Sequence, residues 1–187
     1  MKRLFIAVKI EPGEKLCSLF DELRRKLASE RISWVSPHNL HITLKFFGET
    51  PEEEIPKIIT VMESAVNGIT PFDLVIRKTG LFGSRYQPKV IWFGLEQDEP
   101  LRQLQTQLTA ELKTIGFFPD RQNFVPHLTI ARIRNVTDKQ SFQKVIAEVR
   151  DVDLQHSHID KLILFESCLT PRGAVYEVLV ETGLKDE

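Results

Sequence analysis

Two short stretches of this chain pair a histidine with a threonine two residues later. The first pair is His41 and Thr43, and the second is His127 and Thr129. Alternate side chains of an extended strand point to opposite faces, so each pair should share one face while the apolar residues between and after it are buried on the other. Two such strands side by side would place two imidazoles and two hydroxyls around one cleft.

This set of side chains suits acid–base chemistry on a phosphate ester. An imidazole has an ordinary pKa of about 6.5, so at neutral pH one ring accepts a proton while the other donates one. Each well-placed proton transfer contributes about 10²–10⁴ in rate. Threonine hydroxyls are short, rigid donors for phosphate oxygens. No carboxylate accompanies either histidine at ligand spacing, so a metal-dependent hydrolase is the weaker alternative.

Composition sets the limits within which this chemistry must operate. The chain has 187 residues, is 42% hydrophobic and 27% charged, and carries a formal net charge of −1. These values are typical of a soluble globular protein, and they predict no overall basic field for nucleic acid. No apolar run is long enough for a membrane span, and residues 1–8 are expected to form a strand rather than a signal peptide. Cys17 and Cys168 show no motif spacing, so we expect a reducing, cytoplasmic location.

Hydrophobic periodicity predicts the elements that must position the two pairs. Thr50 and Glu53 are expected to form a capping box at a helix start, and the segments 152–158 and 159–167 are expected to pair. The predicted strands cover 3–9, 32–35, 39–48, 72–82, 90–95, 125–132, 152–158, 159–167 and 175–182, and the predicted helices cover 14–29, 50–66, 98–116 and 137–149.

The order of these elements repeats. Strand, helix, His–Thr strand, helix and long strand occur once, and the same order restarts at Val90, with the two histidines about half the chain apart. We therefore expect one bilobal α+β domain over 1–187, with repeat halves of roughly 1–88 and 89–187. Its two antiparallel sheets, related by a pseudo-twofold axis, should face a central cleft with helices outside. A doubly wound parallel sheet is disfavoured because no glycine-rich loop follows the first strand.

Several stretches resemble one known family. Two His-X-Thr-X motifs half a chain apart are the signature of the two-histidine (2H) phosphoesterase superfamily. The chain is similar to its RNA 2′,3′-cyclic phosphodiesterase branch, historically called 2′–5′ RNA ligase. The similar stretches span most of the chain: residues 3–8, 34–35, 39–49, 88–92, 124–132 and 166–176.

The resemblance implies a function and a role for each motif residue. It implies metal-free, cofactor-independent hydrolysis of RNA 2′,3′-cyclic phosphate ends to 2′-phosphomonoesters, with weak reversible 2′–5′ ligation. His41 matches the proton donor to the leaving 3′-oxygen, and His127 matches the acceptor that activates water. Thr43 and Thr129 match the phosphate-holding positions. The expected partner is RNA or a nucleotide with a cyclic-phosphate end, and the expected state is a monomer.

Arg132 and Lys45 are the further candidates for phosphate binding. Arg132 matches a phosphate-contacting arginine of the family, yet strict alternation from Thr129 sends it to the face of Leu128 unless the strand ends or bulges after Ile130. Lys45 falls on the face of His41 by alternation, at the rim of the cleft.

Other residues have simpler expected roles. Trp34, Trp92 and Phe46 could stack on a base, but core packing is expected for each. His156 and His158 are expected to be exposed. The alternative to an enzyme is a nucleotide-binding or RNA-end-binding module that uses the same cleft without turnover.

Overall fold

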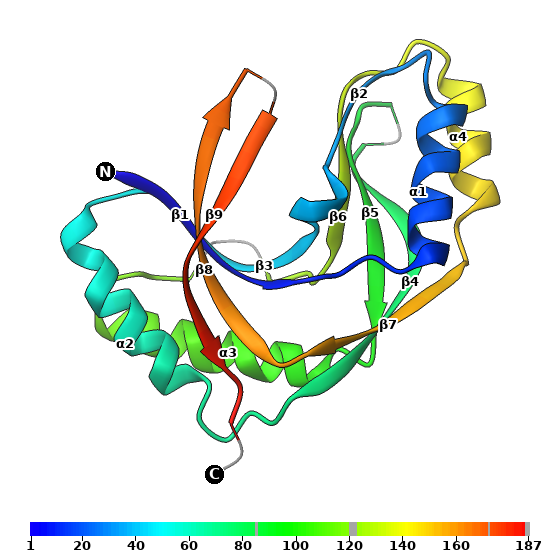
Figure 1. Ribbon diagram of the computed structural model, residues 1–187. Coiled ribbons are helices and arrows are strands. Elements are labelled where there is room, and N and C mark those ends of the chain that lie inside the picture. Colours follow the sequence, from blue (N-terminus) through cyan, green and yellow to red (C-terminus); the bar gives the residue numbers. More distant parts are fainter. Residues whose placement is uncertain (85, 120–122, 172, 186–187) are drawn as a thin grey trace.

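A computed structural model describes residues 1–84, 86–119, 123–171 and 173–185 (Figure 1). Four α-helices and nine strands occur in these ranges. The strands are β1 (Lys2–Lys9), β2 (Arg31–Trp34), β3 (His41–Thr50), β4 (Phe72–Gly83), β5 (Pro88–Glu96), β6 (Leu128–Asn135), β7 (Asp153–Ile159), β8 (Lys161–Thr170) and β9 (Gly173–Gly183). The helices are α1 (Glu14–Lys26), α2 (Ile55–Ala65), α3 (Glu99–Thr114) and α4 (Lys139–Glu148).

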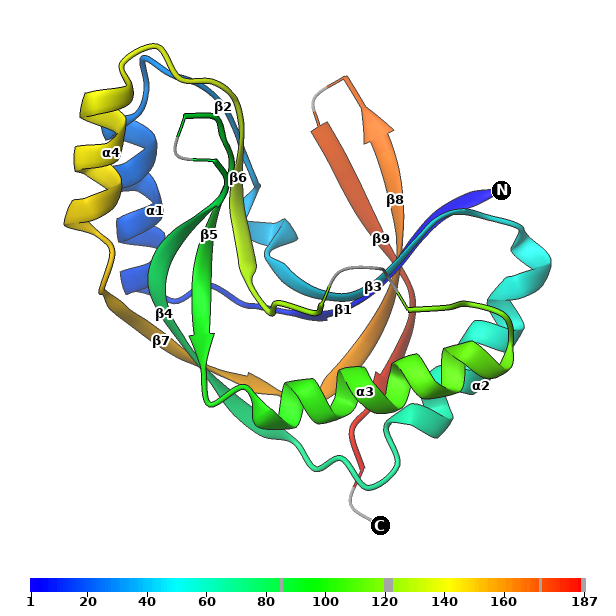
Figure 2. The same cartoon turned by 180° about the vertical axis from the view of Figure 1, so that it is seen from behind.

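The strands form two antiparallel sheets, which are the two arms of the molecule in Figures 1 and 2. The first sheet has the order β3-β1-β8-β9, and the second has the order β2-β6-β5-β4-β7. In the first sheet, the His–Thr strand β3 lies beside β1, the first strand of its own half, and β1 lies beside β8, from the second half. In the second sheet, the His–Thr strand β6 lies beside β5, the first strand of its own half, and β5 lies beside β4, from the first half. Because the two halves exchange strands, the two lobes do not coincide with the segments 1–88 and 89–187.

The helices lie outside the two sheets. α1 and α4 cover the outer face of the second sheet, while α2 and α3 pack together below the first (Figures 1 and 2). One buried apolar cluster joins residues of both sheets and all four helices, and it includes Ile6, Leu23, Met62 and Leu108. The expected α+β architecture of two antiparallel sheets is confirmed. Within the described ranges, none of the helices has the length and apolar character needed to cross a membrane.

Two local predictions are wrong. Segments 152–158 and 159–167 do not pair with each other: β7 pairs with β4 in the second sheet, whereas β8 pairs with β1 and β9 in the first. Only Asp160 separates β7 from β8. A hairpin needs a loop of about two residues or more, so the chain crosses from one sheet to the other instead of reversing.

The capping box at Thr50 is also absent. Thr50 is the last residue of β3, and its hydroxyl donates to the carbonyl of Gly48 at 3.1 Å. A short 3₁₀ turn, Glu52–Glu54, follows, and α2 begins only at Ile55, with a proline in its first turn and no side-chain cap. The strand therefore extends through the residue that the sequence pattern assigned to the cap.

β4 and β5 approach each other closely on the face that carries Thr129 and His127, since Trp92 pairs with Thr129 and Phe82 packs on His127. Gly80 lies opposite Trp92 in the β4–β5 ladder, and a Cβ atom on Gly80 would lie 2.2 Å from the indole ring. The indole in turn contacts the ring of Phe82, with 5.2 Å between centroids. Only glycine leaves room for this packing.

We predict that Gly80→Ala lowers the free energy of unfolding by about 1–3 kcal/mol, because the added methyl group would displace the indole of Trp92. Urea unfolding of the purified variant measures this change. Gly183→Ala is the matched control, since a Cβ there meets nothing within 4 Å. A Gly80→Ala protein as stable as the control would contradict this packing.

Candidate active site

The two His–Thr pairs lie on β3 and at the start of β6. Their apolar neighbours are buried as alternation predicts: Leu40, Ile42, Leu44, Leu128 and Ile130 are all 5% exposed or less. The two histidines and two threonines are half-buried on the opposite face. The buried apolar residues therefore fix the orientation of both strands, and the His–Thr pairs face the space between the lobes.

Both imidazoles are held by the same hydrogen bond. Nδ1 of His41 lies 2.6 Å from the carbonyl oxygen of Asn39, and Nδ1 of His127 lies 2.7 Å from that of Val125. A carbonyl oxygen only accepts, so each Nδ1 must carry the proton and donate it. The neutral ring then keeps its lone pair on Nε2. Each histidine is thereby prepared as a base through Nε2 when neutral and as an acid through the same atom when protonated.

Asn39 fixes the first histidine in a second way. Its side-chain amide donates to the carbonyl oxygen of Ala174 on β9 at 2.9 Å. The residue whose carbonyl orients His41 is therefore also held by a hydrogen bond to the β8–β9 hairpin.

Aromatic rings support each imidazole. His41 packs against Phe5 and Tyr176, with ring centroids 4.9 and 5.1 Å away. These two rings belong to a small cluster with Phe165 beneath the first lobe's inner face. His127 packs edge-to-face on Phe82 at 4.7 Å. The rings are thus held in place by contacts with aromatic side chains, which also bury part of their surface.

Burial and charge lower the pKa of both histidines below the ordinary value. Burial is the main cause in each case, and the bond to the carbonyl opposes it. The positive charge of Arg132 lowers the pKa of both rings further, and His127 also lowers that of His41. One guanidinium and both imidazoles are therefore within electrostatic reach of one another.

A bulge explains why Arg132 lies near the histidines. In the β5–β6 ladder, Trp92 pairs with Thr129 and Ile91 with Ala131, so Ile130 is the extra residue. Ile130 and Ala131 are both buried, and Arg132 is exposed on the face of Thr129. Strict alternation placed Arg132 on the wrong face, and the bulge that we allowed as an exception is present.

An equivalent bulge in the other half moves Lys45. Thr43 pairs with Ala7 and Lys45 with Ile6, so Leu44 is the extra residue, one position after the threonine as in β6. Lys45 therefore leaves the face of His41, contrary to the prediction from alternation. Its ammonium donates to the carbonyl of Phe118 at 2.9 Å, at the rim of the cavity described next.

The bulge at Leu44 also places Phe46 on the inner face, opposite Phe5. Phe46 is 44% exposed, with the guanidinium of Arg3 5.1 Å from its ring centroid, so the expected core packing of this residue is wrong. Trp34 does pack inward, against Phe20. Sequence patterns missed Phe5, Phe82 and Tyr176, because only the pairing of the strands brings these rings to the histidines.

A cavity of about 690 Å³ opens beside the two pairs. Its wall combines polar residues of α3 with apolar groups at the rim. It is lined by Thr43, Leu44, Lys45, Phe46, Gln105, Thr106, Thr109, Pro119, Asn123, Phe124, Val125 and His127. A second hollow of about 120 Å³ adjoins His41 and Tyr176 on the other side. The space around the motifs is thus large enough for a nucleotide.

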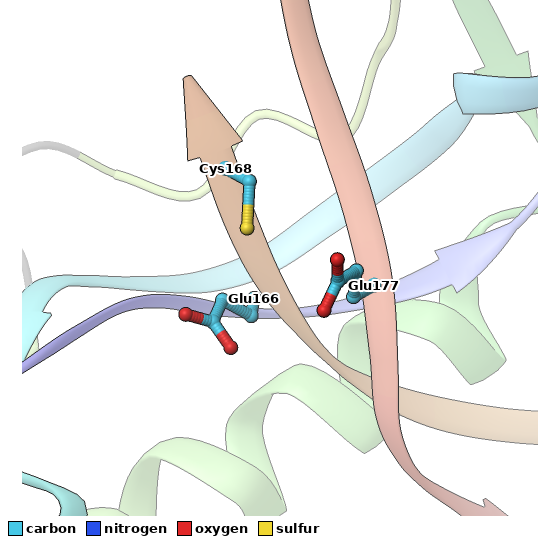
Figure 3. Close-up of side chains that lie close together, drawn as sticks. All are labelled: Glu166, Cys168 and Glu177. Atoms are coloured by element: carbon cyan, nitrogen blue, oxygen red, sulfur yellow. The ribbon is translucent and has the colours of Figure 1, made fainter. Parts of the chain in front are cut away.

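One group of potential metal ligands lies elsewhere. Figure 3 shows Glu166, Cys168 and Glu177 close together on β8 and β9. They occupy the face of the sheet opposite Tyr176, since Glu166 pairs with Glu177 and Ser167 with Tyr176. Lys2 already pairs with Glu166, and burial together with the two carboxylates raises the pKa of the Cys168 thiol. In the parts of the chain that are described, neither motif histidine belongs to a group of three such ligands.

The geometry defines a class: a bilobal α+β protein with two equivalently held histidines and one arginine that acts on both. A family model described as the 2′-5′ RNA ligase superfamily matches residues 12–167. The chain belongs to this superfamily and, within it, to the RNA 2′,3′-cyclic phosphodiesterase family.

Named relatives support the assignment along the whole chain. The RNA 2′,3′-cyclic phosphodiesterase of Methanothermobacter thermautotrophicus is 34% identical over 93% of this chain and 94% of its own. That of Thermotoga maritima is 33% identical over 96% and 94%. Among solved structures, TT0787 of Thermus thermophilus has a TM-score of 0.80 at 30% identity, covering 99% of both chains. Escherichia coli LigT in complex with 3′-AMP shares the fold, with a TM-score of 0.73 at 21% identity over 98% of both chains. These matches confirm the resemblance predicted from the motifs.

We predict that Arg132→Gln raises the pKa of both His41 and His127, because a positive charge that opposes their protonation is removed. NMR titration of the imidazole protons measures both values. In the unaltered protein both should titrate below about 6.5. Arg134→Gln, two residues further on the same strand, is the control and should leave both values in place. Unchanged titrations in Arg132→Gln would remove Arg132 from the site.

Proposed function

We propose that this protein is a phosphodiesterase that hydrolyses RNA 2′,3′-cyclic phosphate ends to 2′-phosphomonoesters. The observation that carries the proposal is the matched pair of imidazoles, each held through Nδ1, with one arginine acting on both. Binding alone does not require two titrating groups prepared in the same way. Family membership agrees with the proposal, since relatives at 31–34% identity bear the name RNA 2′,3′-cyclic phosphodiesterase.

The roles proposed for the histidines follow the family pattern. His127 accepts a proton through Nε2 from the attacking water, and an oxygen–phosphorus bond forms. The bond from phosphorus to the 3′-oxygen breaks, and His41 donates its Nε2 proton to that oxygen. The phosphate remains on the 2′-oxygen, and both histidines return to their first states after exchanging protons with solvent. The reverse sequence would join RNA ends weakly through a 2′–5′ bond.

The other site residues are proposed to hold the phosphate. Thr43 and Thr129 each stand two residues after a histidine, on the same face, where their hydroxyls would donate to non-bridging oxygens. Arg132 would neutralise the charge on the phosphate, and Lys45 would act only from the cavity rim. The donor set of imidazole, hydroxyl and guanidinium supplies acid, base and charge stabilisation without a metal cofactor.

Two further features belong to the proposal. A nucleotide or RNA end is the expected ligand, in keeping with the solution of LigT structures with 3′-AMP and with NADP⁺. One chain supplies both histidines, so we propose a monomer. Cys17 and Cys168 are both free thiols, which agrees with a cytoplasmic location.

We predict that His41→Ala and His127→Ala each lower hydrolysis of 2′,3′-cyclic AMP by about 10²–10⁴, the usual contribution of one proton transfer. His156→Ala is the matched control, because His156 is exposed on β7. Product analysis by chromatography should show the 2′-phosphate, and a chelator should leave the rate unchanged. Near-full activity in either motif variant, or a 3′-phosphate product, would refute the assigned roles. Binding of the nucleotide without turnover in the unaltered protein would favour the binding module.

We also predict a bell-shaped pH dependence of kcat/KM with its maximum below about pH 6.5. The pKa values of both free histidines are lowered, so the active form, with the donor protonated and the acceptor neutral, is most populated near these two lowered pKa values. The negative charge of bound substrate raises both values, so kcat should reach its maximum at a higher pH than kcat/KM. A flat profile across this range would contradict two cooperating imidazoles.

A further inference from the structure

A separate, basic hollow lies near the end of β6, in the lobe that carries Arg132. It has a volume of about 210 Å³ and is lined by residues at and just before the start of β5, at and just after the end of β6, and at the start of α4. Three cations line it: Lys89, Arg134 and Lys139. None of its described lining residues carries a carboxylate; the others are Tyr86, Gln87, Pro88, Ile133, Asn135 and Val136.

The positive charge of this hollow is not neutralised within the described part of the protein. Neither Lys89 nor Lys139 forms an ion pair there, and Arg134 donates only through Nε, to the hydroxyl of Ser33 at 3.1 Å. The remaining guanidinium N–H groups of Arg134 are left for another acceptor. A local excess of three cations stands out in a chain whose formal net charge is −1.

The nearby carboxylates are already engaged. Glu30 accepts the backbone N–H groups of Thr137 and Asp138. Asp138 accepts the N–H of Ser141 as the cap of α4. Both acids thus serve the start of the helix, and neither lines the hollow.

One strand connects this hollow to the catalytic phosphate site. Arg132 and Arg134 are both exposed on one face of β6, with buried Ile133 between them. At about 3.3 Å per residue, their Cα atoms are separated by roughly 7 Å, a spacing that suits successive phosphates of an extended strand. Tyr86, 78% exposed, adds an aromatic ring at the rim.

We infer that this hollow binds the backbone of single-stranded RNA on the 5′ side of the cyclic-phosphate end. The inference rests on the proposed function, which places that end at Arg132. Arg134, Lys89 and Lys139 hold the phosphates that precede the end, and the ring of Tyr86 stacks on a base without regard to sequence. The site therefore distinguishes RNA from a cyclic mononucleotide, which does not extend beyond Arg132.

The test compares 2′,3′-cyclic AMP with a pentaribonucleotide that ends in a 2′,3′-cyclic phosphate. The double variant Lys89→Gln/Lys139→Gln should raise KM for the pentanucleotide and leave kcat and KM for 2′,3′-cyclic AMP unchanged. The slope of log kcat/KM against log salt for the pentanucleotide should become shallower by roughly 0.7 for each phosphate that the protein no longer neutralises. Tyr86→Ala should also weaken only the pentanucleotide.

The matched control is Lys15→Gln/Lys113→Gln, which removes two exposed lysines on α1 and α3. An equal effect of the two double variants, an effect of Lys89→Gln/Lys139→Gln on both substrates, or no effect at all would each overturn the inference. Fluorescence anisotropy with the 2′-phosphate form of the pentanucleotide measures binding independently of turnover. If the unaltered protein cleaves neither substrate, the proposed function fails. The binding assay still tests the hollow: weaker binding of the pentanucleotide by Lys89→Gln/Lys139→Gln than by the control variant supports RNA binding there, and equal binding contradicts it.

Discussion

The site depends on one interaction that occurs twice: the hydrogen bond from Nδ1 of each motif histidine to the carbonyl two residues earlier. At 2.6 and 2.7 Å these bonds fix the orientation and the tautomer of each ring. They leave Nε2 as the only ring atom that exchanges a proton. Because both acceptors are main-chain atoms, the arrangement follows from the path of the chain into each strand. The same backbone geometry in two equivalent places therefore prepares both imidazoles in the same way, and the proposed acid and base roles depend on it.

The fold serves this pair by exchanging strands between the repeated halves. β8, from the end of the chain, completes the sheet of His41, and β4, from the first half, completes the sheet of His127. Each histidine is thus backed by an aromatic ring from a strand of the other half, Phe165 and Tyr176 on one side and Phe82 on the other. A core shared by both sheets holds the lobes in register. The histidines therefore keep their relative position only while both halves are folded together.

The features predictable from sequence were those set by periodicity. Alternation identified the inner face of each motif strand, and the repeated element order indicated two sheets. The bulges at Leu44 and Ile130 could not be found in this way, because an extra residue is defined only against its partner strand. Arg132, Lys45 and Phe46 all follow a bulge, and alternation misplaced each one. The pairing of β7 with β8 was also predicted wrongly from periodicity. Two consecutive apolar-alternating segments have the same sequence pattern whether they pair with each other or continue from one sheet into the other.

The most direct test of the two-histidine site is a crystal structure with a bound nucleoside 2′-phosphate. We expect Nε2 of His41 and Nε2 of His127 each to lie about 3 Å from oxygens of the same phosphate, with the guanidinium of Arg132 beside it. A phosphate that contacts one histidine while the other ring is turned away would contradict this expectation.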